Sequence, residues 1–119
     1  MRQAGVLAAA GLIALEKSPG RLHEDHRRAK RLAEAVARIP GFAIDTRKVR
    51  TNILIFDCSK TGRTAVEWCD VFYKHGLWTQ DTALHSVRFV THCDVDDAGI
   101  DRARSVLHEV AAQPQKASA

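Results

Sequence analysis

The run Val-Arg-Phe-Val-Thr-His at residues 87–92 constrains the fold most, because it is rich in strand-forming residues yet carries an arginine. Side chains alternate along a strand, so Val87 and Phe89 would lie on one face, and Arg88 and Val90 on the other. An arginine is costly to bury without an anion, and its planar fork suits a carboxylate. Two interpretations stay open: an edge-strand arginine whose head lies in water, and an arginine aimed at a ligand carboxylate.

The composition indicates one globular domain, since 119 residues with 45% apolar and 27% charged side chains can form a single core. The net charge of +4 is too small and too dispersed to indicate a nucleic-acid partner. The basic residues Arg27, Arg28, Lys30 and Arg31 alternate with apolar and acidic positions, which favours a solvated helix face. No run is long and apolar enough to span a membrane, so we expect no membrane partner.

Metal and redox motifs are absent from the sequence. The cysteines Cys58, Cys69 and Cys93 are odd in number and match no zinc or redox spacing, which predicts reduced thiols in the cytoplasm or an organelle matrix. His23 and His26 lie three apart on a predicted helix, but no third ligand is evident nearby. We therefore predict no metal site.

The apolar run at residues 5–15 allows two interpretations. A secretory signal peptide is disfavoured, because the run continues into Glu16 and Lys17 without a small-residue cleavage site. The alternative is a long helix that is apolar nearly all round and hence buried on several sides. Such a helix needs a partner surface, supplied by another chain or by a missing piece of this one.

Hydrophobic periodicity and turn residues predict the remaining elements. The predicted helices span residues 21–39, which Pro40 and Gly41 end, 64–75, which Gly76 ends, and 97–110, which residues 94–97 cap. The predicted strands span residues 42–44, 51–57, 77–79 and 86–91, with a loop at 81–85. The predicted core faces of the three helices are Leu22, Ala29, Leu32, Ala33, Val36 and Ile39; Val66, Cys69, Val71 or Phe72, and Tyr73; and Ile100, Ala103, Val106, Leu107 and Val110.

This order predicts an α+β fold: a small, mostly antiparallel sheet with helices packed on one face, preceded by a long apolar helix. The sequence has no glycine-rich phosphate loop, no Gly-x-Ser-x-Gly turn and no Cys–His pair at a recognisable spacing. Residue chemistry alone therefore gives a small α+β domain with one arginine in an unusual place.

Four motifs together carry a family resemblance. They are residues 1–11, which begin Met-Arg-Gln-Ala-Gly; Leu22-x-Glu24-Asp25-His26; Thr51-Asn52-Ile53; and Val-Arg-Phe-Val-Thr-His-x-Asp-Val at residues 87–95. In this order and spacing they resemble the low-specificity L-threonine aldolases, which are pyridoxal phosphate (PLP) enzymes of the aspartate aminotransferase fold, type I. The resemblance covers nearly all of the chain apart from its tail.

The resemblance implies a domain organisation and a reaction. Residues 1–112 would be the C-terminal, small domain, in which residues 1–17 form the helix that enters from the large domain, and residues 113–119 a disordered tail. The family cleaves L-threonine or L-allo-threonine to glycine and acetaldehyde, with PLP as the electron sink for the carbanion at Cα.

The resemblance also implies roles for a few residues. Arg88 matches the arginine that pairs with the substrate carboxylate, and Arg2 matches one that reaches the cofactor, at its phosphate. Asn52 and His92 lie in matching motifs, and we expect structural roles for both. No lysine lies in a motif that matches the Schiff-base lysine, so we expect no catalytic residue here and an inactive isolated chain.

Two functional hypotheses follow. In the first, the chain is part of an aldolase that acts on amino acids such as threonine and glycine, in a cytoplasmic homo-oligomer. In the second, it is a truncated, non-enzymatic interaction or regulatory module that oligomerises through its exposed apolar helix.

Overall fold

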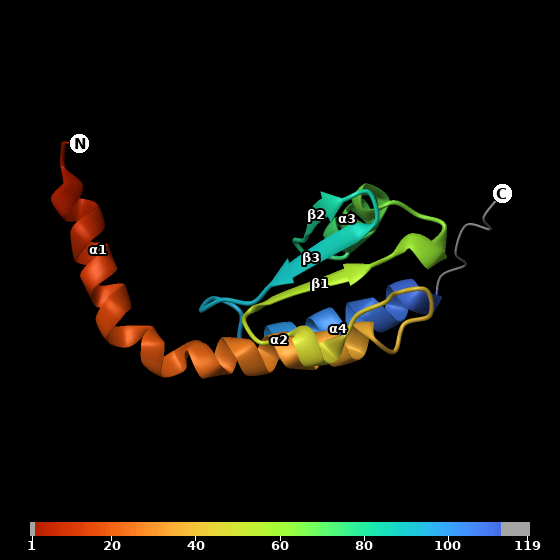
Figure 1. Cartoon of the computed structure of the whole chain (residues 1–119), viewed down its shortest axis with the longest axis horizontal. Helices are drawn as coiled ribbons and strands as arrows, with labels where there is room; N and C mark the ends of the chain where they lie inside the picture. Colours follow the sequence, from red (N-terminus) through yellow and green to blue (C-terminus); the bar gives the residue numbers. More distant parts are fainter. Residues whose placement is uncertain (1, 113–119) are drawn as a thin grey trace.

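The chain folds into a small sheet with helices on one face. The computed structural model describes residues 2–112. The strands of this part are β1 (Ile53–Asp57), β2 (Gln80–Ala83) and β3 (Ser86–Val90), all antiparallel, in the order β1-β3-β2. The helices are α1 (Ala4–Lys17), α2 (Leu22–Val36), α3 (Ala65–Lys74) and α4 (Asp97–Ala112), with short 3₁₀ turns at Pro19–Arg21, Thr46–Lys48 and Ser59–Thr61. The predicted α+β class is confirmed (Figure 1).

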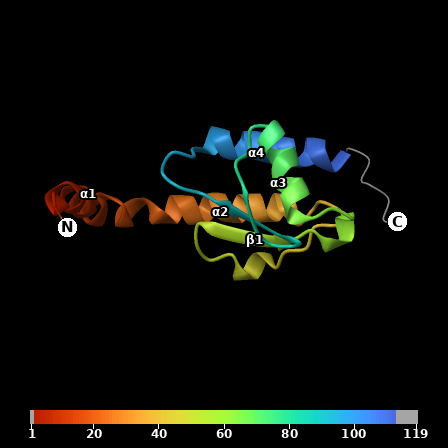
Figure 2. The ribbon, with the colours of Figure 1, turned by 90° about the horizontal axis from the view of Figure 1, so that it is seen from above.

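The core lies between the sheet and helices α2, α3 and α4 (Figure 2). Leu54, Phe56, Val87 and Phe89 alternate along β1 and β3 and are buried, as the period-two pattern predicts. The rings of Phe56 and Phe89 meet edge to face with centroids 5.4 Å apart, a favourable aromatic geometry. The opposite face of the sheet is open.

Helices α2 and α4 bury the stripes that their periodicity predicts. All five predicted α4 residues are buried, and on α2 only Leu22, in the first turn, is exposed. The prediction for α3 was right in part: Phe72 is buried, and Cys69 and Val71 are half-buried against the core. It was wrong for Val66 and Tyr73, which are exposed, and it missed the buried Trp68. Trp68 Nε1 donates a hydrogen bond to Thr61 Oγ1 at 2.8 Å, and this contact selects the buried face of α3.

The predicted strand at residues 77–79 and loop at 81–85 were also wrong. The strand is β2, Gln80–Ala83, which pairs with β3 through a tight turn. All four of its residues are exposed. A polar edge strand of this kind lacks the apolar alternation that identifies a strand in a sequence, and polar edges protect sheets from association. Residues 42–44 contribute only an isolated bridge, from Ala43 to Asp57.

Glycines with positive φ occur in the turns that follow α2 and α3. Helix α2 ends at Val36, with Ala37 as its C-cap, slightly before the predicted limit at Ile39. Gly41 then adopts a φ of +88°, and a Cβ there would lie 2.8 Å from Thr61 Cγ2. Gly76, after α3, has a φ of +82°. Both glycines therefore adopt a left-handed backbone conformation, which residues with a Cβ atom rarely adopt.

Helix α1 projects from one end of the molecule, at an angle to α2 (Figure 1). None of its 14 residues is buried, so the expected burial is not provided by the described part of this chain. Its apolar side chains Val6, Leu7, Leu12, Ile13 and Leu15 are all more than half exposed. Across residues 2–112, no helix has the length and apolar character needed to cross a membrane. The expected tail at 113–119 lies outside the described residues.

Candidate functional site

Arg88 lies at the middle of the open face of the sheet. It belongs to β3, which is the central strand, so the interpretation of an edge-strand arginine was wrong. Its direct neighbours across the ladder are Ile55 on β1 and Gln80 on β2. Val87 and Phe89 point into the core, which leaves Arg88 on the opposite face, where the alternation predicted it.

The guanidinium of Arg88 is only partly satisfied by the protein. One terminal nitrogen, Nη2, donates a hydrogen bond to Oε1 of Gln80. Its Nε is buried and has no hydrogen-bond partner among the described residues. A buried, unpaired donor on a cation costs free energy unless a further acceptor arrives. The group thus has unused capacity for an anion.

The surroundings of Arg88 on this face are partly apolar. Ile53, Ile55 and Val90 are between 41% and 50% exposed, and the same face also carries the polar residues Asp57, Ser86 and Gln80. Within residues 2–112, no carboxylate forms an ion pair with Arg88, although several other arginines are paired. A guanidinium without a carboxylate partner remains free to pair with the carboxylate of a ligand.

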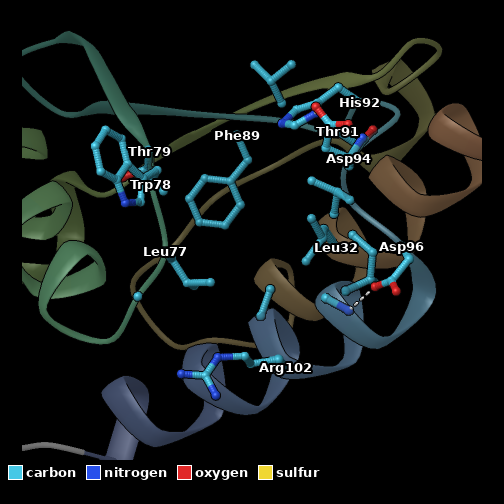
Figure 3. A pocket seen from close by; sticks show the side chains of 16 residues that line it. Leu32, Leu77, Trp78, Thr79, Phe89, Thr91, His92, Asp94, Asp96 and Arg102 are labelled. Atoms are coloured by element: carbon cyan, nitrogen blue, oxygen red, sulfur yellow. Dashed lines mark hydrogen bonds and ion pairs between the residues drawn. The ribbon is translucent and has the colours of Figure 1, made fainter.

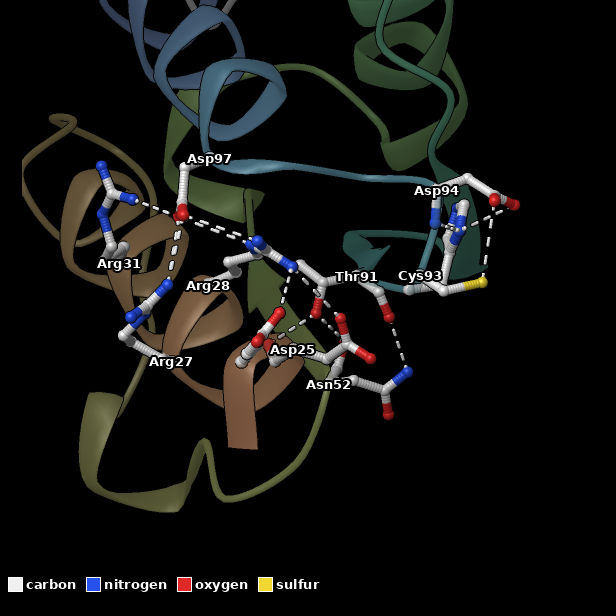
Figure 4. A network of polar contacts seen from close by, with 11 residues as sticks. Asp25, Arg27, Arg28, Arg31, Asn52, Thr91, Cys93, Asp94 and Asp97 are labelled. Carbon is white, nitrogen blue, oxygen red and sulfur yellow. Dashed lines mark hydrogen bonds and ion pairs between the residues drawn. The ribbon is translucent and has the colours of Figure 1, made fainter. Parts of the chain in front are cut away.

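Three of the matching motifs meet at the start of the loop after β3. Thr91 Oγ1 donates to the backbone oxygen of Asp25, in α2, at 2.7 Å. Asn52 Nδ2 donates to the backbone oxygen of Thr91 at 2.8 Å, and Thr91 N donates to Asn52 O at 2.9 Å (Figure 4). Asn52 therefore has the structural role that we expected. These bonds fix the end of β3 on α2 and β1, and so position the strand that carries Arg88.

An ion cluster joins α2 to the first turn of α4 beside this junction. Asp97 lies 2.9 Å from Arg31 Nη1, 3.2 Å from Arg27 Nη2 and 3.4 Å from Arg28 Nε (Figure 4). The hydrogen bond from Arg28 holds the pKa of Asp97 below its ordinary value of 3.8. Arg28 is buried and lies 3.7 Å from Asp25. The prediction of a solvated basic face was therefore wrong at Arg28, whose main partner lies far along the chain.

Side chains that could hold a metal gather at one place in the described part of the chain. His92, Cys93 and Asp94 each offer one ligand atom, and these atoms lie within 4.8 Å of one another. All three residues are exposed, and their group is not one that the sequence analysis considered. His23 is exposed and His26 half-buried, and neither belongs to such a group.

A hollow of about 310 Å³ lies between α4, the loop after β3 and the segment before β2. Its floor includes Leu32 and Phe89, Arg102 lies at one side, and His92 and Asp94 lie at another (Figure 3). Arg88 does not line it. Arg88 is therefore not part of the wall of the hollow, although Val90, on the same face of the sheet, lines it.

Arg2 is exposed and lies two residues before the start of α1. The N-terminal end of α1 lies away from the sheet (Figure 1).

Comparison with known proteins gives these features a context. The family model for beta-eliminating lyases matches residues 1–59. The probable low-specificity L-threonine aldolase 2 of Arabidopsis thaliana is 32% identical over 111 residues, which are 92% of this chain and 31% of the relative. The low specificity L-threonine aldolase of Escherichia coli strain K12 is 35% identical over 112 residues, 94% of this chain and 29% of the relative. The chain belongs to the low-specificity L-threonine aldolase family.

The low-specificity L-threonine aldolase 1 of Arabidopsis thaliana matches a shorter part, with 39% identity over 67 residues, 56% of this chain and 19% of the relative. The chain thus spans less than a third of the length of these curated aldolases. The resemblance seen in the motifs is confirmed at the level of the family.

One contact of the candidate aldolase site was missed in the sequence analysis. Gln80 was placed between a predicted strand and a predicted loop, and no partner was foreseen for it. Its cross-strand position opposite Arg88 depends on the β2–β3 hairpin, and the weak strand pattern of residues 80–83 hid that hairpin. The sequence did offer one signal: Gln80 lies only a few residues before the predicted strand that holds Arg88, which is the spacing of two strands joined in a hairpin.

Proposed function

We propose that this chain is the part of a PLP-dependent L-threonine aldolase that holds the substrate carboxylate, and that Arg88 makes the contact. The buried, unpaired Nε of Arg88 on an open sheet face supports this proposal most. Two parallel hydrogen bonds from an arginine fix both the position and the plane of a carboxylate. Fixing the carboxylate orients the bonds at Cα of threonine, so the role of Arg88 is substrate orientation.

The described residues do not fit a complete PLP site. The lysines of residues 2–112 are Lys17, Lys30, Lys48, Lys60 and Lys74, and all are exposed. A lysine that forms a Schiff base needs a pocket that lowers its pKa and excludes water. We therefore propose that the isolated chain is inactive and that the remaining groups of the site lie in other parts of a longer aldolase.

Kinetics in a grafted enzyme test the role of Arg88. The chain replaces the matching segment of the Escherichia coli aldolase, and threonine cleavage is measured for the arginine and for Arg88→Gln. We expect Arg88→Gln to lower kcat/KM by about 10- to 100-fold, because it removes hydrogen bonds to a charged group. Arg88→Lys keeps the positive charge without the planar guanidinium, so its kcat/KM should lie between the values for arginine and for Arg88→Gln. An Arg88→Gln enzyme with unchanged kcat/KM would refute the proposal.

Borohydride reduction tests the proposed inactivity. The isolated chain is mixed with PLP, reduced and digested, and modified lysines are located by mass spectrometry. We expect only substoichiometric labelling spread over the exposed lysines. A single stoichiometric adduct, with a shifted visible absorption band, would mean that the chain itself forms a cofactor site.

For Arg2 we propose contact with the cofactor phosphate in the complete protein. Arginine is well suited to phosphate, and the exposed position of Arg2 leaves its guanidinium available. In the grafted enzyme, Arg2→Ala should weaken PLP affinity by about tenfold, measured by fluorescence titration of the apoenzyme, while KM for threonine at saturating PLP changes little. Unchanged PLP affinity would remove Arg2 from the site.

The alternative function is a non-enzymatic module that assembles through α1. The exposure of every residue of α1 favours this second candidate. Size-exclusion chromatography of the chain with and without the Escherichia coli aldolase distinguishes the two. Co-elution with the aldolase would support the module, and independent elution would count against it.

A further inference from the structure

Gln80 is the immediate cross-strand neighbour of Arg88. The two residues are register partners on adjacent antiparallel strands, where directly opposed Cβ atoms lie about 4.5–5.5 Å apart. The amide oxygen Oε1 of Gln80 accepts a hydrogen bond from Nη2 of Arg88. The register of β2 on β3 shifts only between Asp81 and Ala83. The pair of Gln80 and Arg88 lies before that shift and is in regular register with the next pair, Asp81 and Val87.

We propose that Gln80 is a positioning residue that holds the Arg88 guanidinium in place for the ligand carboxylate. This inference rests on the proposed function of Arg88. The long arginine side chain has several rotatable bonds, and their restriction before binding lowers the entropic cost of binding. Gln80 supplies that restriction from a neighbouring strand, without touching the substrate.

The chemistry of an amide suits this role. The guanidinium has five N–H donors, and the bond to Gln80 Oε1 uses one of them. The amide is neutral, so it orients Arg88 and leaves the positive charge uncompensated. A carboxylate at the same position would pair with Arg88 and compete directly with the ligand.

The other side of Arg88 provides no equivalent contact. Its register partner on β1 is Ile55, which has no polar side-chain atom. The buried Nε of Arg88 is unpaired among the described residues. Gln80 is therefore the side chain of the described residues that fixes the guanidinium, while other N–H groups of Arg88 remain available to a carboxylate.

The experiment is nuclear magnetic resonance of the 119-residue chain, observing the Arg88 side-chain N–H groups. The variants are Gln80→Met, which keeps the side-chain length without an acceptor, Gln80→Glu, and the matched neighbour control Ile55→Val. The probes are L-threonine and L-threoninol, which differ in the carboxylate. Arg88→Gln assigns the signals by their disappearance.

Two quantities are measured for each variant: the rate of rotation about the bonds of the guanidinium, and the shift of the Arg88 Nε–H signal upon addition of each probe. We expect Gln80→Met to speed the rotation several-fold and to reduce the L-threonine shift several-fold, with Ile55→Val close to the parent. Gln80→Glu should slow the rotation and abolish the L-threonine shift, because an internal ion pair replaces the ligand.

Rotation and L-threonine response that stay at parental values in Gln80→Met would overturn the positioning role. A parent chain whose Arg88 signal responds equally to L-threonine and L-threoninol would instead contradict the proposed function of Arg88. In that case the rotation rates still decide whether Gln80 holds the guanidinium, so the two failures are distinguishable.

Discussion

The hydroxyl of Thr91 helps to hold in position the strand that carries Arg88, the candidate ligand-binding residue. Its side chain is 1% exposed, and its hydroxyl donates to the backbone of α2 while its backbone pairs with Asn52. The alternation along residues 87–91 places Thr91 on the same, buried side as Phe89. It did not predict the partner, because Asp25 is 66 positions away along the chain.

Thr91→Val should therefore destabilise the fold while keeping its shape. The substitution leaves the backbone oxygen of Asp25 without this donor, so we expect a loss of about 1–2 kcal/mol in the free energy of unfolding, measured by urea denaturation. Thr82→Val is the control, since Thr82 is exposed and its bond to Ser86 O is long, at 3.3 Å. Equal losses in the two variants would contradict the role of Thr91.

The thiols differ in reactivity because their environments differ. Burial raises the pKa of Cys58 to about 11, and its Sγ lies 3.3 Å from His85 O. At pH 8 only about one Cys58 in a thousand is a thiolate, which is the reactive form. We expect iodoacetamide to label the exposed Cys93 and to spare Cys58 in the native chain, with both labelled in guanidinium chloride, as followed by mass spectrometry. Rapid native labelling of Cys58 would show that its site opens easily.

Among the elements, α2 and α4 are joined by both apolar packing and charge. Their apolar stripes were visible in the sequence because each repeats with helical period. The ion cluster on Asp97 was not visible, because it depends on the side-by-side placement of two helices far apart in the chain, which run in the same direction (Figure 2). The same reason explains Arg28, which looked solvated in its own helix yet is buried against α4.

The Asp97 cluster predicts a pH-dependent contribution to stability. Hydrogen bonding from Arg28 lowers the pKa of Asp97 below 3.8, so the contribution is complete above that value and disappears as the pH falls through the lowered, folded-state pKa. We expect Asp97→Asn to lower Tm at pH 7, and the difference from the parent to be smaller at pH 2, which is below the ordinary pKa of 3.8. The measurement is thermal unfolding followed by circular dichroism.

Asp70→Asn is the matched control for Asp97→Asn, because Asp70 is exposed on α3 and outside the cluster. It should leave Tm nearly unchanged at both pH values. If the Tm difference for Asp97→Asn persisted undiminished at pH 2, the effect would arise from something other than the carboxylate charge.

The hairpin of β2 and β3 marks the limit of pattern-based prediction for elements. Residues 80–83 are exposed, and all but Ala83 are polar, so their strand conformation is set by pairing with β3 and not by burial. Missing that strand also meant missing the position of Gln80 beside Arg88. The candidate site was thus half predicted: the arginine and its face were foreseen, and its neighbour was not.

The molecule as a whole is elongated, with principal extents of 56 × 30 × 24 Å. A packed body of sheet and three helices accounts for the core, while α1 extends from it and buries none of its own residues (Figure 1). The apolar composition of residues 5–15 predicted a helix that needs a covering surface. No part of the described chain covers α1.

Exposed α1 predicts self-association of the isolated chain. We expect Leu12→Glu to reduce association, seen as a lower mass in light scattering at the same concentration, because Leu12 is 62% exposed on α1. Unfolding of the body should be unaffected, since α1 buries no residue. Ala98→Glu, at an exposed position of α4, adds the same charge elsewhere and should leave the association unchanged. Equal effects of the two variants would point to net charge and not to α1.

The central claim is that Arg88 recognises a carboxylate, and a binding cycle in the grafted aldolase tests it most directly. Dissociation constants of L-threonine and L-threoninol are measured from cofactor absorbance, with arginine and with glutamine at position 88. We expect Arg88→Gln to weaken the binding of L-threonine by about 10- to 100-fold and to leave the binding of L-threoninol nearly unchanged, because only L-threonine carries the carboxylate. Equal weakening of both ligands would contradict the account, since the arginine would then act on something other than the substrate carboxylate.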